Sequence, residues 1–241
     1  MPVLEINVSG ECQLTRAAER AFISVRVSAD STDQEEAAHN ATRAVNVLHA
    51  QFRELSPKTE TGDIAPDAPI TIYNIGSITT SSRIPTDRDD KPTGPRQYSA
   101  FASLSAVFRD FSKLAQLASQ LFTMPFVEVR SIDWRLTDAT TAELTKEARK
   151  KALLDAIEKA TLFSQVVKRD VSVVEINDQD EYSSTSQPLH MPRYFMARAA
   201  EHPGPDETAL ELEPQEIVVT ASIKAKFATA EYKRPNLLAH Y

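Results

Sequence analysis

The sequence predicts an α+β protein in which antiparallel β-sheets are covered on one side by long amphipathic helices. Some segments alternate polar and apolar residues, as half-buried strands do, whereas others repeat apolar residues every three or four positions, as helices do. These segments follow the order strands, helix, hairpin, helix, strand, long helix, strand, loop and strand. Strands that alternate in this way favour antiparallel sheets with one face packed on a core.

The first strand segments lie close to the N-terminus, at residues 4–8 and again at residues 23–29. Residues 70–84 and 97–110 show the same alternation on either side of the polar turn DRDDKPTGP. We therefore expect these two segments to form a long hairpin.

Three further segments have strand character, at residues 126–136, 171–176 and 216–230. In the first of these, the apolar phase shifts between Val129 and Ile132, which predicts a β-bulge. In the last, alternate apolar residues from Ile217 to Phe227 share one face.

Apolar residues at helical spacing predict a long helix over residues 32–55, where Thr32 and Glu35 can form a capping box. A shorter helix is expected to begin near Asp110. A third helix is expected from Thr140 to about Lys168, with another capping box at its start.

The third helix has an alanine at every fourth position: Ala148, Ala152, Ala156 and Ala160. This spacing places four methyl groups in a narrow ridge on one side of the helix. We expect the ridge to pack closely on the protein's own sheet, and the alternative is a surface kept free for a partner.

Composition and charge disfavour several classes of partner. The 241 residues are 41% hydrophobic and carry a net charge of −7, which opposes binding to nucleic acid or anionic lipid. No secretory signal and no stretch long enough to span a bilayer is found, so a cytoplasmic or nuclear location is expected. Cys12 is the only cysteine, which suits a reducing compartment.

The sequence predicts no enzymatic activity, no cofactor and no metal. Its five glycines are not spaced as a phosphate-binding loop, and the acidic turn at residues 87–90 lacks the pattern of a calcium loop. We interpret that turn as solvated. The alternative is a hydrolase-like enzyme whose site is assembled from scattered residues, including His190 and His202.

Residues 179–210 lose all periodicity and are rich in serine and proline, so a long loop or disordered insertion is expected there. Residues 230–241 are expected to form a loose tail. Within the loop, four apolar residues are candidate partner-binding residues: Met191, Tyr194, Phe195 and Met196. They are candidates because such side chains anchor partners, and the alternative is that they cover the protein's own core.

The chain resembles the SIMPL domain family. The matching segments are INVSGE, FISVRVSADSTDQEEAAHNATRAVNVL, QYSAFASLSAVFRDFSKLAQLAS, SIDWRLTD, EARKKALLDAIEKATLFSQVV and EIVVTASIKAKF. Two departures are that Ala18-Glu19 stands where relatives usually have Pro-Asp, and that glycines common around the third helix are missing. The resemblance implies a single SIMPL-like domain over residues 1–229.

This resemblance also implies a class of function. Bacterial relatives are exported, are linked to oxidative stress and can form ring-like oligomers, whereas an animal relative is a kinase-associated adaptor in inflammatory signalling. No shared enzymatic activity is established for the family. We therefore expect an intracellular, non-enzymatic scaffold or adaptor that oligomerises or binds protein partners, linked to stress response or signalling.

Overall fold

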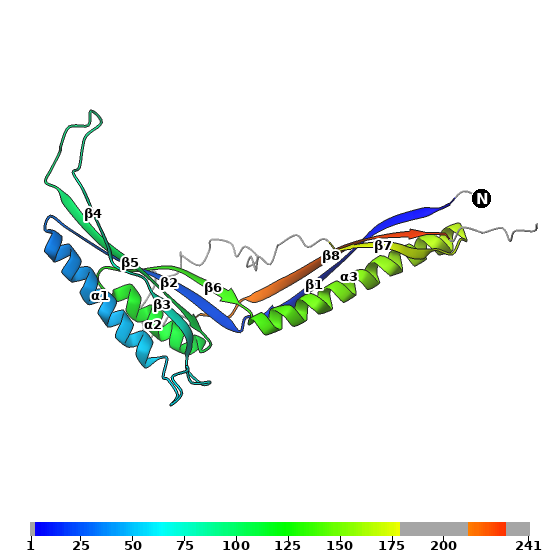
Figure 1. The fold of residues 1–241 in the computed structure, drawn as a ribbon, viewed down its shortest axis with the longest axis horizontal. Coiled ribbons are helices and arrows are strands. Elements are labelled where there is room, and N and C mark those ends of the chain that lie inside the picture. Colours follow the sequence, from blue (N-terminus) through cyan, green and yellow to red (C-terminus); the bar gives the residue numbers. More distant parts are fainter. Residues whose placement is uncertain (1–2, 179–211, 230–241) are drawn as a thin grey trace, which may run out of the picture. The chain divides into compact units, whose positions relative to one another are not determined.

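A computed structural model describes residues 3–178 and 212–229 (Figure 1). These residues form two compact units, which are described separately below. Unit 1 contains residues 3–16, 137–178 and 216–229, and unit 2 contains residues 17–136 and 212–215. The α+β class is confirmed, with antiparallel sheets and helices. The single domain over 1–229 stays a prediction. The predicted insertion at 179–210 and the predicted tail at 230–241 lie outside the described residues.

In unit 2, five strands and two helices are described: β2 (Arg20–Ser31), α1 (Gln34–Glu54), β3 (Ile70–Ile75), β4 (Thr79–Arg83), β5 (Gln97–Phe108), α2 (Phe111–Thr123) and β6 (Val127–Arg135). The sheet has the order β3-β5-β2-β6, and β4 also pairs with β5. The predicted hairpin is confirmed, but its first arm is divided into β3 and β4. At the division, Gly76 N donates to Ser103 O at 2.8 Å.

The predicted β-bulge is also confirmed. Ser24 pairs with Ser131 and the next residue, Val25, pairs with Val129. Arg130 is therefore the additional residue in β6, and this explains the shift in apolar phase that the sequence shows.

Helices α1 and α2 cover one face of this sheet (Figure 1). The covered face is lined by alternate residues of β2 and β5, all at most 1% exposed: Ala21, Ile23, Val25, Val27, Ala29, Ala100, Ala102, Leu104, Ala106 and Phe108.

The predicted cap of the first helix was wrong by one residue. Its N-cap is Asp33, which accepts from Glu35 N at 2.8 Å, whereas α2 is capped by Asp110 near its predicted start.

In unit 1, three strands and one helix are described: β1 (Glu5–Ala17), α3 (Asp138–Val167), β7 (Ser172–Asp178) and β8 (Glu216–Ala228). The strand order is β1-β8-β7, and α3 lies along the sheet (Figure 1). β1 is longer than the predicted segment 4–8, because Cys12 and Leu14 continue the alternation that Ile6 and Val8 begin.

Helix α3 begins two residues before the predicted position and ends close to the expected residue. Thr137 is the N-cap and accepts from Thr140 N at 3.3 Å, so the capping box predicted at Thr140 was wrong. At the other end, Lys168 adopts a left-handed conformation with φ of 52°. Arg169 N donates to Ser164 O at 3.1 Å, and this bond closes the last turn.

Candidate functional site

The alanine ridge of α3 packs on the sheet of unit 1, as predicted. All four alanines are at most 1% exposed. Ala156 and Ala160 form a cluster with Ala225 and Phe227 of β8, and Val8 of β1 packs against this cluster. Small side chains let the helix lie very close to the strands, so the ridge is structural and is not a free binding surface.

A polar contact holds the β1 side of the helix. Asp155 accepts from Glu11 N at 2.9 Å and from Lys159 Nζ at 2.7 Å. Lys159 Nζ also donates to Ser9 O at 2.9 Å. The hydrogen bond from Lys159, followed by that from the Glu11 backbone, lowers the pKa of Asp155 below its ordinary value of 3.8.

About two turns earlier, Glu147 and Lys151 form a second ion pair on α3, with 2.7 Å between Nζ and Oε1. The hydrogen bond between them lowers the pKa of Glu147 and raises the pKa of Lys151. Both side chains are about half exposed, so this pair contributes little to stability. The basic residues of this helix are thus partly neutralised by its own acids.

The other feature of unit 1 is a concentration of exposed apolar side chains. Of the fifteen large hydrophobic residues that are exposed in the described chain, nine lie between 154 and 176. We define the α3–β7 surface as the seven of these in the last turns of α3 and in β7: Leu162, Phe163, Val166, Val167, Val173, Val174 and Ile176. Val166 is the most exposed of them, at 75%.

Strand β7 contributes to this surface as an edge strand. It pairs with β8 on one side, and every one of its residues is exposed. Val173 lies opposite Phe227 and Ile176 opposite Ala225, while Val174 falls at a register shift. Val173 and Ile176 therefore lie on the same face as the buried residues of β8, yet α3 leaves them open to solvent.

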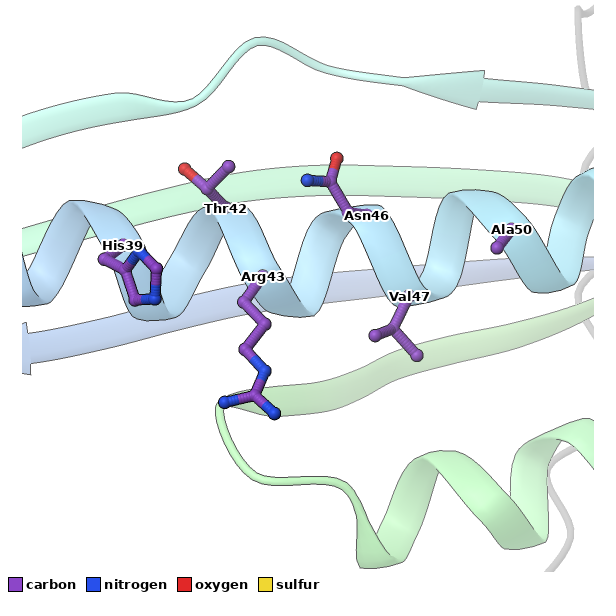
Figure 2. A pocket seen from close by; sticks show the side chains of 6 residues that line it. All are labelled: His39, Thr42, Arg43, Asn46, Val47 and Ala50. Carbon is purple, nitrogen blue, oxygen red and sulfur yellow. The ribbon is translucent and has the colours of Figure 1, made fainter.

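A separate depression of about 430 Å³ lies on α1 of unit 2. Its lining residues all come from this one helix: His39, Thr42, Arg43, Asn46, Val47 and Ala50. Figure 2 shows that Thr42 and Asn46 point to one side of the helix, whereas Arg43 and Val47 point to the other. No carboxylate lines the depression beside His39, so its geometry does not assemble an acid and a base.

Other groups with potential chemistry are dispersed in the described residues. The structure there contains no cluster of three or more side chains suited to a metal ion. In the predicted acidic turn, Asp87 Oδ1 accepts from the backbone N of Asp89 and of Lys91, each at 2.9 Å. That carboxylate therefore accepts hydrogen bonds from within the turn.

The sequence-predicted site residues Met191, Tyr194, Phe195 and Met196 all lie outside the described residues. His190 and His202, on which the hydrolase alternative rests, lie there too. Both hypotheses therefore stay predictions.

The α3–β7 surface was missed by the sequence reasoning, although a signal for it was present. Leu162, Phe163 and Val166 do not follow the four-residue register of the alanines that ends at Ala160. In β7, two consecutive valines, Val173 and Val174, must point to different faces of a regular strand. Apolar residues that do not fit the spacing of the buried residues therefore indicated the exposed α3–β7 surface.

The fold and these surfaces define an α+β protein. A family model described as SIMPL, a protein of unknown function (DUF541), matches residues 6–227. The chain belongs to the SIMPL family. No curated protein matches the chain. In the described residues, no helix is both long enough and apolar enough to cross a membrane.

Proposed function

We propose that this SIMPL protein is a non-enzymatic scaffold or adaptor that self-associates through the α3–β7 surface. The observation that carries the proposal is the exposure of apolar side chains on neighbouring segments, with Val166 at 75%, Leu162 at 58% and Val174 at 61%. Exposed apolar side chains gathered in one part of a chain are typical of protein interfaces.

The edge of β7 supports the same proposal. Its outer backbone groups have no strand partner in the described chain, and an unpaired, apolar edge promotes association with another chain. A symmetric contact between two copies would pair this edge with its counterpart and remove it from solvent.

The cellular setting is a further part of the proposal. We place the protein inside the cell, where its single thiol, Cys12, suits a reducing compartment. A role in stress response or signalling rests on the resemblance to SIMPL relatives. No catalytic role is included, because the depression on α1 offers His39 no acidic partner.

Light scattering over a wide range of protein concentration tests this function. We expect a mass above the 26.7 kDa of one chain, decreasing towards that value on dilution. A mass of one chain at every concentration would contradict self-association. In that case the scaffold function would need a different partner.

A further inference from the structure

The five-stranded sheet of unit 2 has a second face, which neither α1 nor α2 covers. Along β2, the side chains on this face alternate with the buried residues of the covered face, and they include Phe22, Ser24 and Arg26. We call this the open face. It continues onto β5 through Phe101 and Val107 and onto β6 through Arg135.

Two arginines of the open face lie over aromatic rings. The Arg26 guanidinium carbon is 5.1 Å from the centroid of the Phe101 ring, and that of Arg135 is 4.3 Å from the centroid of the Phe22 ring. Stacking of this kind fixes a planar guanidinium in place. Neither arginine forms an ion pair with a carboxylate in the described residues.

The acidic residues of the open face have other partners. Asp30 accepts from Ser99, and Asp133 accepts from Ser131 at 3.2 Å. Glu128 pairs with Arg130 at 3.3 Å. The two stacked guanidinium groups therefore keep N–H donors available for carboxylates from outside the sheet.

An apolar row lies beside these arginines. Ile72 of β3 is opposite Val107 of β5, and Val107 is opposite Phe22 of β2. Ile72 is 65% exposed, which is unusual for an isoleucine within a sheet. A ligand that lies across the strands would thus meet apolar side chains and a guanidinium group together.

We propose that the open face binds an extended, carboxylate-rich segment of a protein partner. Phe22 and Arg26 are four residues apart on β2, which corresponds to about 13 Å along a strand. An extended peptide that carries carboxylates along one face can reach both arginines. This site is separate from the α3–β7 surface and does not depend on self-association.

Single-stranded nucleic acid fits this face less well, although it is also anionic. Nucleic acid binds to a sheet by stacking bases on free aromatic rings. On the open face, Arg26 and Arg135 already lie over Phe101 and Phe22. Carboxylates, by contrast, accept hydrogen bonds from the N–H groups at the edges of the guanidinium planes.

Fluorescence anisotropy with a short labelled peptide of alternating glutamate and threonine tests the proposal. We expect the full-length protein to bind this peptide, and to bind a matched peptide with glutamine in place of glutamate much more weakly. The double variant Arg26→Gln, Arg135→Gln should lower the affinity by about tenfold or more. Arg26→Lys, Arg135→Lys keeps the charge without the planar fork and should lower affinity by a smaller factor.

The matched control is Arg43→Gln, Arg53→Gln, which removes two exposed charges from α1 on the other side of the sheet. It should bind the glutamate peptide as the unchanged protein does, and every variant must keep its unfolding midpoint. Equal losses in both glutamine double variants would show a bulk charge effect and overturn the proposal. A single-stranded oligonucleotide that binds as tightly as the peptide would also overturn it.

Two further outcomes would contradict this site. If the unchanged protein fails to bind the glutamate peptide, the open face is not a carboxylate site. If light scattering instead gives a lower oligomer mass for the Arg26→Gln, Arg135→Gln variant than for the unchanged protein, while neither protein binds the peptide, the occupant of the open face is a second copy of this chain. The first outcome does not bear on the α3–β7 surface, whereas the second would place the contact between copies on the open face and so contradict self-association through the α3–β7 surface.

Discussion

Gly10 of β1 and Ala152 of α3 approach so closely that no side chain fits between them. A Cβ atom added to Gly10 would lie 1.9 Å from the carbonyl oxygen of Ala152 and 2.6 Å from the backbone N of Ala156. Both neighbours are backbone atoms of a regular helix, so they cannot move aside without shifting the helix. This contact sets the distance between α3 and its sheet.

Gly10→Ala should therefore destabilise the protein by about 3 kcal/mol, through overpacking against the helix backbone. Chemical denaturation measures the change. Gly94→Ala is the matched control, because its added Cβ would have Pro85 Cγ as its nearest contact, at 4.0 Å. An equal effect of the two substitutions would contradict the close packing of β1 on α3.

Ala156→Leu should destabilise by about 1 to 3 kcal/mol, because Ala156 is fully buried between α3 and the sheet. The control is Ala142→Leu in the same helix, where the side chain is exposed and the unfolding midpoint should stay unchanged. An unchanged midpoint for Ala156→Leu would show that this side of the helix is free.

Asp155→Asn should lower stability at neutral pH, because the carboxylate accepts from Lys159 and from the Glu11 backbone. The folded-state pKa of Asp155 is lowered, so its contribution is present above the ordinary value of 3.8 and is lost as pH falls through the folded value. The stability difference between the two proteins should shrink below pH 3.8. Unfolding measured across pH checks this, and a difference that does not depend on pH would refute it.

Phe111→Ala should expose Trp134, the only tryptophan in the chain. The two rings pack edge to face, with centroids 4.9 Å apart and an angle of 87° between their planes. We expect a red shift of tryptophan emission and a loss of about 1 kcal/mol from the aromatic pair. Phe122→Ala, on the exposed side of the same helix, should leave the emission unchanged. A shift of the emission in Phe122→Ala but not in Phe111→Ala would contradict the packing of Phe111 on Trp134.

Much of the fold could be predicted because its packing is periodic. The four alanines repeat at one helical spacing, and the phase shift between Val129 and Ile132 is visible in the sequence because a bulge adds one residue to the alternation. The exact caps could not be predicted. Thr32 and Asp33 are adjacent residues of cap-forming type, and the pattern does not decide which of them accepts from the helix.

The α3–β7 surface could not be predicted in the same way, because periodicity identifies which residues share a face but not how much sheet is available to cover them. Helix α3 has 30 residues, and its sheet has three strands in the described chain. One helix face is used by the alanine ridge, so Leu162 and Val166 remain outside the core. The strand at residues 171–176 was predicted correctly, but its exposure as an edge depends on strand order, which no local pattern encodes.

Sedimentation velocity of a surface variant tests the central claim, self-association through the α3–β7 surface, most directly. Phe163→Glu, Val166→Glu places two charges on this surface, where Phe163 is 48% exposed and a folding defect is not expected. Phe122→Glu, at 61% exposed on α2 of unit 2, is the control for adding charge to an exposed apolar site. We predict that the unchanged protein and the Phe122→Glu control sediment as the same oligomer, whereas the double variant sediments as a folded monomer. An oligomer in the double variant that is indistinguishable from the unchanged protein would contradict the account.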